Sequence, residues 1–452
     1  MIPDLPLAIG FGFGLSQYVP LLVYCAGIAA ILATLFYRTD IGLYFLVPFI
    51  PLLVVAEKIQ QYPLGKDFVD LLVLAVIIGT IFRSHGETRH NLSLNISIVL
   101  LLVVTYLGLW IGSWKLGLPW PVSLDNERLI LWKNYAILPI LYFLTIYTVR
   151  TRRQVIIILA LMAVTMLMMD RHFHSTYQWV KSWHYSHEQR VAGAFTYLGP
   201  NELAGFFAQY TMLLAALFLT YKKWLIRLLI SGVIAANLYV ILYLFSRGAY
   251  IAVFVATLVY GIVADRRILI ALIVLGLGWQ FLLPVAVVDR LEMTQSEGEI
   301  TDSSALGRLQ MWKRAGGIIL ANPIVGVGFG TTPYLGFTSY TGEKHRNDIH
   351  SGYLETLMET GLVGFFCAAY IFYCGARSGW KLFRSAKDPL CQGIGLGLIG
   401  VISASLVSNL TGDKWHYLPV MGYFWILLGM VSVMRLRVEE EQKSAAATTD
   451  AP

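Results

Sequence analysis

Hydrophobic positions along this chain gather into long uninterrupted runs separated by short polar links. Each run has roughly 16–24 apolar residues, which is long enough, or nearly so, for a helix to cross a hydrocarbon core of about 30 Å. Because backbone amides in lipid must be satisfied within their own segment, the runs predict helices. We therefore expect an all-α, polytopic transmembrane helical bundle of twelve or thirteen spans, at residues 18–36, 41–56, 68–83, 92–113, 134–149, 154–169, 201–220, 224–245, 247–263, 268–286, 353–376, 389–410 and 418–435.

The longest polar interruption runs from Val287 to Gly361, and a second polar stretch covers 170–200. Lys and Arg concentrate in alternate links, which the positive-inside rule assigns to the cytoplasm. The loops 170–200 and 287–352 then face outward, and the larger one is expected to carry short helices. The tail 437–452 is charged and then rich in Ala and Thr, a composition that predicts a disordered cytoplasmic end.

Composition supports a membrane protein, since 57% of the residues are hydrophobic, 13% are charged and the mean hydropathy is +0.65. Soluble proteins carry about 25% charged residues. The net charge of +7 is typical of some nucleic-acid-binding proteins, but the excess basic residues lie in links between spans. Membrane orientation explains them better. We expect the lipid bilayer as a partner and no nucleic acid.

Two arginines lie where apolar runs meet the predicted outer surface. Arg190 precedes the turn at Asn201, and Arg247 interrupts a long apolar stretch. A guanidinium group is a planar cationic fork suited to phosphate oxygens, and a charge at such a depth needs a partner or a wet cavity. We predict anion binding by both, supported by Asn201. Snorkelling of Arg190 and a simple junction charge at Arg247 are the alternatives.

Within the large outward loop, residues 304–320 predict an amphipathic helix with Arg308, Trp312 and Ala315 on one face. Arg308 is a third candidate for phosphate binding, although a membrane-surface helix without chemistry has the same pattern. The following glycines, at positions 326, 328 and 330, lack the strand and helix context of a nucleotide site. They predict a tight turn instead.

His350 is the sharpest candidate for chemistry, because it lies where the next span begins. The partial positive charge of a helix N-terminus disfavours imidazolium, and a neutral imidazole at an outer cleft is suited to act as a general base. Tyr353, Glu355 and Glu359 follow on the same segment and are expected to support it, by orienting the site or by neutralising an arginine. A structural, hydrogen-bonded histidine is the alternative.

The loop 170–200 also contains closely spaced histidines, namely His172, His174, His184 and His187. No cysteine and no helical H-E-x-x-H pattern accompanies them, so an aromatic-rich surface loop is the better interpretation than a zinc site. We expect neither a metal ion nor a cofactor.

At these residues the chain resembles the O-antigen ligase family, membrane glycosyltransferases that include polysaccharide polymerases and O-linked oligosaccharyltransferases. The resemblance covers about 190–365, and Ser351 departs from it, because the family often has Asn after the histidine. The matching pieces occur in order: Arg190-x-x-Gly193 with Pro200-Asn201, Ser246-Arg247-Gly248, Gly307-Arg308 with Trp312, Asn322-Pro323 with Gly326-Val327-Gly328-Phe329-Gly330, and His350-x-x-Tyr353-Leu354 with Glu359-x-Gly361.

The resemblance implies a GT-C-like bundle that takes a glycan from undecaprenyl pyrophosphate on the periplasmic side of the bacterial inner membrane. Arg190, Arg247 and Arg308 would bind the pyrophosphate, and His350 would take the proton of the acceptor hydroxyl, with inversion and without metal. The acceptor is a growing glycan, lipid A core or a protein. The resemblance also implies N-terminal spans at 1–170, a catalytic core at 171–365 and C-terminal spans at 366–436.

Two other classes of protein are compatible with the pattern. A polysaccharide transporter or lipid-linked oligosaccharide flippase predicts charges deep within spans and inverted repeats with broken helices. A structural subunit of an envelope complex predicts that His350 can be changed without loss of polymer.

Overall fold

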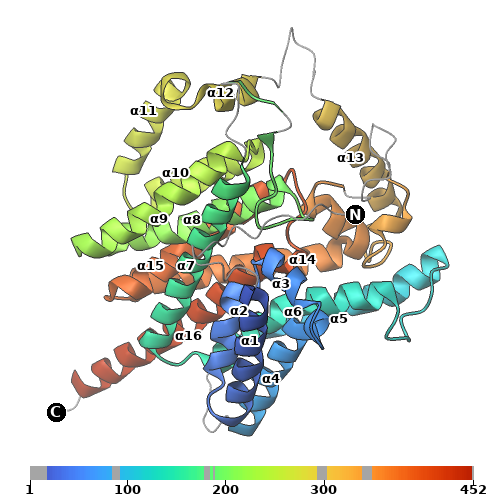
Figure 1. The fold of residues 1–452 in the computed structure, drawn as a ribbon, viewed down its shortest axis with the longest axis horizontal. Coiled ribbons are helices and arrows are strands. Elements are labelled where there is room, and N and C mark those ends of the chain that lie inside the picture. The colour runs from blue at the N-terminus through green and yellow to red at the C-terminus, as the bar shows by residue number, and fades with distance from the viewer. Residues whose placement is uncertain are drawn as a thin grey trace.

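The computed structural model describes residues 18–83, 92–177, 184–186, 189–292, 303–337 and 349–449. Within these ranges the regular elements are helices, as expected for an all-α protein (Figure 1). In chain order they are α1 (Val19–Phe36), α2 (Asp40–Phe49), α3 (Leu53–Ile59), η2 (Gly65–Asp67), α4 (Phe68–Arg83), α5 (Leu92–Leu116), α6 (Glu127–Thr148), α7 (Arg152–Thr176), α8 (Pro200–Thr220), α9 (Trp224–Tyr243), α10 (Arg247–Val263), α11 (Arg267–Leu282), α12 (Val285–Glu292), α13 (Ser303–Ala321), η4 (Thr332–Tyr334), α14 (Gly352–Ser385), α15 (Pro389–Ser408) and α16 (Leu418–Thr449).

The structure confirms a multi-pass helical membrane protein. Nine helices of the described chain are long and apolar enough to cross a bilayer, or up to eleven if each of two bent pairs is one span, and α10 is a shorter apolar helix. This number is below the twelve or thirteen predicted, because two predicted spans are broken and two others, α4 and α10, have only 16 and 17 residues.

Both breaks occur at proline residues. The predicted span 41–56 is divided into α2 and α3, which meet at 108° around Pro51. The predicted span 268–286 is divided at Pro284 into α11 and α12, which meet at 103°. Proline removes a backbone donor and clashes with the preceding turn, so an unbroken apolar run was not enough to predict a straight span.

The centre of the bundle is α15, which packs against α8, α10 and α14. Small residues allow this approach: a Cβ atom added to Gly379 of α14 would lie 2.7 Å from the carbonyl oxygen of Gly395 in α15. Close backbone contact of this kind is typical of helices packed in membranes. Figure 1 shows α9–α12 grouped on one flank and α1–α4 on another, so different helices line the two sides of the core.

The long helix α14 is interrupted at Gly361, whose φ of 62° and ψ of −164° are not helical. The preceding segment of the chain pairs with the break. Val327 N donates to Met358 O over 2.8 Å, and Leu362 N donates to Pro323 O over 2.8 Å. Backbone groups that the kink frees are thereby satisfied, as they must be at membrane depth.

The tail prediction was wrong for most of its length, because α16 continues to Thr449. Glu439 Oε1 lies 3.4 Å from Arg435 Nη1 one turn earlier, and Gln442 Nε2 donates to Ser385 O over 3.0 Å. Ion pairs at this spacing and the run of alanines favour a helix, which composition alone did not reveal.

Candidate active site

His350 lies in the short link that leads into α14, with a φ of 53°. Positive φ is uncommon for a residue with a side chain and costs energy unless its surroundings enforce it. The neighbours do so here. Ile349 is fully buried, its carbonyl accepts a 3.0 Å hydrogen bond from Trp312 Nε1, and Ser351 is 4% exposed.

The link between α15 and α16 braces the start of α14. Gly352 N donates to Asn409 O over 3.1 Å and to Gly412 O over 3.0 Å. A Cβ atom at Gly352 would lie 2.9 Å from Asn409 Oδ1, which itself accepts a 2.7 Å hydrogen bond from Lys414 N. The residues after His350 are therefore held by a segment about 60 positions away in the sequence.

The same link meets the start of α10, where Arg247 lies. A Cβ atom at Gly248 would be 2.8 Å from Thr411 Oγ1. Thr411 adjoins Gly412, whose carbonyl accepts from Gly352 N. Arg247 and His350, about 100 positions apart in sequence, thus begin two helices that contact one short link.

Arg190 is tied to the same region. Its Nη2 atom donates to Asn201 Oδ1 over 2.6 Å, and its Nε atom donates to Leu244 O over 3.3 Å, three residues before Arg247. Burial lowers the pKa of the Arg190 guanidinium, and the like charge of Arg290 lowers it further. The structure places Asn201 on Arg190, as the supporting role requires, while the functional roles of both stay predictions.

Arg290 is a candidate that the sequence analysis missed. It is 6% exposed, and its guanidinium carbon lies 4.9 Å from the centre of the Tyr185 ring. The preceding residue, Asp289, lies 2.8 Å from His184 Nδ1 through its Oδ2 atom. The two outer loops therefore meet at α12. The break at Pro284 was the sequence signal that this arginine turns back toward the bundle.

The closely spaced histidines of the loop 170–200 lie in different surroundings. His184 contacts Asp289, and His172 is a buried residue of α7. His187 lies outside the described residues, as do Trp179 and Trp183.

Arg308 is partly buried in α13, one helical turn before Trp312. The shared face of this helix is confirmed, since Ala315 is fully buried and packs in one cluster with Ile349 and Met358. The structure thus brings the helix of Arg308 to the His350 link, while phosphate binding by Arg308 stays a prediction.

Glu359 and Tyr353 are structural supports. The Glu359 carboxylate accepts hydrogen bonds from Gly330 N (2.8 Å), Thr332 N (3.0 Å) and Thr332 Oγ1 (2.7 Å), so it orients the glycine-rich loop. Tyr353 donates from its hydroxyl to Leu406 O over 2.8 Å, and its ring lies 4.7 Å from that of Trp415.

Arg128 of α6 holds the other side of the loop and was also missed. It is 3% exposed and donates from Nη2 to Phe329 O over 3.0 Å and to Leu109 O over 2.7 Å. Gly328 lies against α5, where an added Cβ atom would be 2.4 Å from Gly112 N. The glycines therefore serve close backbone approach, as predicted from their setting.

Glu355 forms a cluster with Asp413 and His416, whose potential ligand atoms all lie within 4.8 Å of one another. Burial alone would raise the pKa of Asp413, but the imidazole of His416, then Glu355 and Lys414, hold it below its usual range. Two carboxylates and an imidazole can bind a divalent cation or hydrogen-bond a polar ligand. The sequence motifs did not include Asp413 or His416.

Two large cavities adjoin these residues. The first, of about 720 Å³, is lined by both polar and apolar residues and includes Glu355, Asp413 and His416. The second, of about 730 Å³, lies among α8–α12 and is almost entirely apolar. Among the residues that the structure describes, the two cavities share no lining residue, and both fall within the size range of about 300–1,000 Å³ typical of ligand sites.

The fold is that of a multi-pass helical membrane protein, and its described part contains one cavity of mixed polarity and one that is almost entirely apolar. Residues 232–369 match a family model described as O-Antigen ligase. A comparison with curated proteins finds no match. The family match indicates a glycosyl-transferring enzyme of the ligase or polymerase type. It includes Arg247, Arg308 and His350 but not Arg190.

Proposed function

We propose that the protein is an inverting, metal-independent glycosyltransferase that moves a glycan from undecaprenyl pyrophosphate to an acceptor hydroxyl on the periplasmic face of the bacterial inner membrane. The observation that carries the proposal is an apolar cavity whose lining residues are sequence neighbours of two arginines, Arg247 and Arg290. The acceptor is a glycan, lipid A core or a protein hydroxyl, and the product is an O-antigen or another surface polysaccharide.

The apolar cavity suits a polyprenyl tail. Its walls come from α8, α9, α10, α11 and α12, and α11 has no buried residue. Burial of apolar surface contributes about 25 cal/mol per Å², so a long hydrocarbon chain gains substantially from such a site. A wall made of one sparsely packed helix also provides a route for a lipid to enter from the bilayer.

The rim of this cavity lies beside the arginines. Tyr250 lines it and is one turn beyond Arg247, while Val287 and Leu291 line it on either side of Arg290. Arg190 is close enough to Arg290 for their charges to repel. A diphosphate between them would replace that repulsion with charge-assisted hydrogen bonds, and no metal ion is needed for this neutralisation.

His350 is positioned for the acceptor. The imidazole belongs to a link that is fixed by Trp312, Asn409 and Gly412, and its strained backbone indicates that the position is enforced. A general base must be held within hydrogen-bond reach of the proton it takes. The alternative function, transport of a lipid-linked oligosaccharide, requires no such base.

Transfer by purified protein in nanodiscs, with undecaprenyl-pyrophosphate-linked glycan as donor, tests the proposal. We expect His350→Ala to lower transfer by about 10²-fold or more while donor binding is retained, because general base catalysis contributes about 10²–10⁴-fold. His174→Ala, an exposed histidine of α7, is the matched control. Wild-type activity should persist in excess EDTA. Full transfer by His350→Ala would contradict the role of the base, and movement of donor across the membrane without transfer would favour a flippase.

A further inference from the structure

We propose that the cavity of about 720 Å³ with a mixed polar and apolar lining, which we call the acceptor chamber, binds the carbohydrate end of the acceptor, with Asp413 and His416 as its recognition residues. The inference rests on the proposed function and extends it, because it names the substrate class and the side of the site from which the acceptor approaches.

The chamber is assembled from segments far apart in the sequence. Its walls include Gly65–Asp70, residues 130–137 at the start of α6, the loop 329–333 and the link 413–419. These segments lie in or next to the links predicted to face outward. A soluble saccharide would therefore meet the chamber from the same compartment as the lipid-linked donor.

The walls offer the mixture of hydrogen-bonding groups that a sugar requires, since each hydroxyl both donates and accepts. Asp413 is 4% exposed, and its Oδ1 atom accepts no hydrogen bond of good geometry from the described residues. His416 Nδ1 lies 3.2 Å from Oδ1 and 3.3 Å from Oδ2, and this nitrogen carries at most one hydrogen, so it can satisfy only one of the two oxygens. Hydrogen-bonding capacity of the buried carboxylate is thus left for a ligand. An unsatisfied buried acceptor costs free energy, and a bound hydroxyl would remove that cost.

Other parts of the wall provide further polar groups. Lys133 forms an ion pair with Asp70, and both side chains are partly exposed to the cavity space. Asn134 lines the chamber beside Lys133. Paired charges and amides that face water-accessible space are free to exchange solvent for sugar hydroxyls with little penalty.

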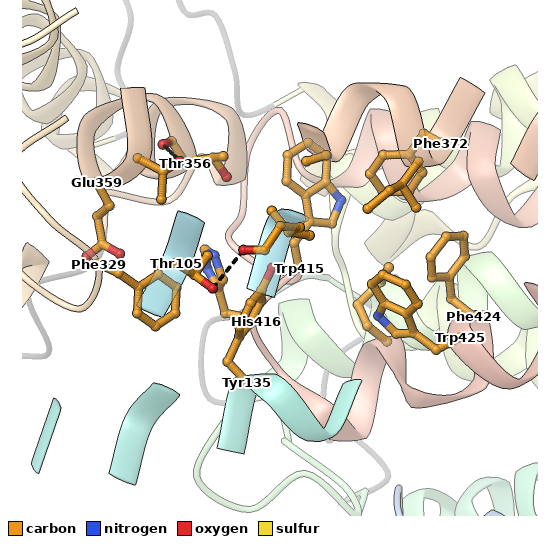
Figure 2. Close-up of a pocket in the computed structure, with 15 residues that line it drawn as sticks. Thr105, Tyr135, Phe329, Thr356, Glu359, Phe372, Trp415, His416, Phe424 and Trp425 are labelled. Carbon is orange, nitrogen blue, oxygen red and sulfur yellow. Dashed lines mark hydrogen bonds between the residues drawn. The ribbon is translucent and has the colours of Figure 1, made fainter. Parts of the chain in front are cut away.

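Aromatic rings form the inner end of the chamber. The ring centre of Tyr135 lies 5.1 Å from that of Phe329 and 5.4 Å from that of His416. Figure 2 shows these three side chains together around a small inner cavity of about 40 Å³, with the Glu359 carboxylate beside Phe329. Flat apolar faces next to hydrogen-bonding groups match a pyranose ring, which has both kinds of surface.

The link between α15 and α16 connects the chamber with the start of α10 and with the segment that follows His350. Thr411 contacts the Gly248 position next to Arg247, Gly412 accepts from Gly352, and Asp413 then enters the chamber. Three consecutive residues thus connect the arginine side, the histidine link and the chamber. An acceptor held by Asp413 would approach His350 from a cavity that shares no wall residue with the lipid cavity.

The reaction balances without another reactant. The acceptor O–H proton goes to the His350 imidazole, and the oxygen forms a bond to the anomeric carbon. The bond between that carbon and the phosphate oxygen breaks, and its electron pair leaves with undecaprenyl pyrophosphate. Attack from the side opposite the leaving group inverts the anomeric centre.

The test uses full-length protein in nanodiscs, with equilibrium dialysis of two labelled probes and acceptor-dependent transfer kinetics. One probe is the oligosaccharide released by mild acid from the surface glycan of the wild-type strain, and the other is the delipidated lipopolysaccharide core oligosaccharide. The probe that binds identifies the source of the acceptor. The variants are Asp413→Asn and His416→Gln, with Lys133→Ala as an exposed wall variant that does not disturb a buried group.

We expect each variant to raise the acceptor KM and the probe Kd by about five- to tenfold, the effect of losing a hydrogen bond or two, while the donor KM is unchanged. His350→Ala should still bind the probe. Asp125→Asn, an exposed carboxylate outside the chamber, is the control. Unchanged acceptor KM and Kd in all three variants, with normal wild-type transfer, would overturn the chamber and leave the proposed function intact.

Two further results are informative. Saturable probe binding that depends on Asp413, in a wild-type protein without transfer activity, would support the chamber and contradict the transferase. Probe binding that is lost in EDTA and restored by Mg²⁺ or Mn²⁺ would overturn direct recognition, because the cluster would then hold a cation.

Discussion

At the residue scale, the structure adds one arginine to the candidate anion-binding arginines that the sequence predicts. Arg190, Arg247 and Arg308 were predicted from local sequence, whereas Arg290 is assigned only by the structure, through Tyr185 and its effect on the pKa of Arg190. A buried guanidinium beside another cation is costly. An anion bound at the rim of the apolar cavity would offset the cost of burying the Arg290 guanidinium there.

We therefore predict that Arg290→Ala raises the donor KM by about tenfold or more, as expected for a charge-assisted hydrogen bond of about 1.5–3 kcal/mol. Arg290→Lys should restore part of the affinity, because lysine keeps the charge but not the bidentate fork. Donor titrations in nanodiscs measure both. Arg227→Ala, which removes an arginine stacked on Phe218, is the control. Equal donor KM for Arg290→Ala and Arg227→Ala would exclude a donor role for Arg290.

Local motifs could not have revealed the remaining residues of the site. Asp413 and His416 lie in the nine-residue link 409–417, which contains no family motif, and Arg128 lies in a predicted outward link. Each acquires a partner only through tertiary contact: Asp413 with Glu355, and Arg128 with the carbonyl of Phe329. Hydrophobic periodicity does not report contacts of that range.

At the element scale, most helices follow directly from the apolar runs. The predicted span 247–263 coincides with α10, and 201–220 differs from α8 by one residue. The failures are bends, at Pro51, Pro284 and Gly361, where a run stays apolar although its backbone changes direction. Each bend adjoins one of the cavities or the glycine-rich loop, so the bends shape the candidate site.

The break at Gly361 makes a direct prediction. A Cβ atom there would lie 2.3 Å from Ile324 O, and φ is 62°. Gly361→Ala should therefore lower the free energy of unfolding by about 1–3 kcal/mol or more and disturb the loop that Glu359 orients. Thermal unfolding in detergent measures the effect. Gly317→Ala in α13, where no atom lies within 4 Å, should instead be neutral or stabilising by about 1 kcal/mol. Similar stability of both variants would contradict the backbone argument.

At the scale of the whole molecule, the bundle separates an apolar site among α8–α12 from a polar site beside α2–α4, α6 and the link before α16. The family match covers residues 232–369, so it includes parts of both. The N-terminal helices resemble the family only in their span pattern, yet they supply much of the polar wall. Variation of acceptor among related proteins would be accommodated there.

A photoreactive group in α11 tests the apolar site. With a diazirine amino acid at Leu275, which lines the cavity, we expect labelling by a polyprenyl pyrophosphate donor that unlabelled donor suppresses. At Leu277, which is 82% exposed and outside the cavity, labelling should follow bulk lipid and resist competition. Mass spectrometry of the adducts gives the comparison. Equal competition at both positions would show that the cavity does not select the donor tail.

Within the described part of the chain the two cavities share no wall residue, and under the proposed function this has a consequence for how a polymer would lengthen. The lipid carrier in one cavity and the growing chain in the other would be bound at the same time, so neither has to dissociate before the other binds. Under the proposed function, a strand of any size would extend into the surrounding space from one cavity while fresh carriers enter the other from the bilayer, and the interior of the protein would set no limit on the length of the product.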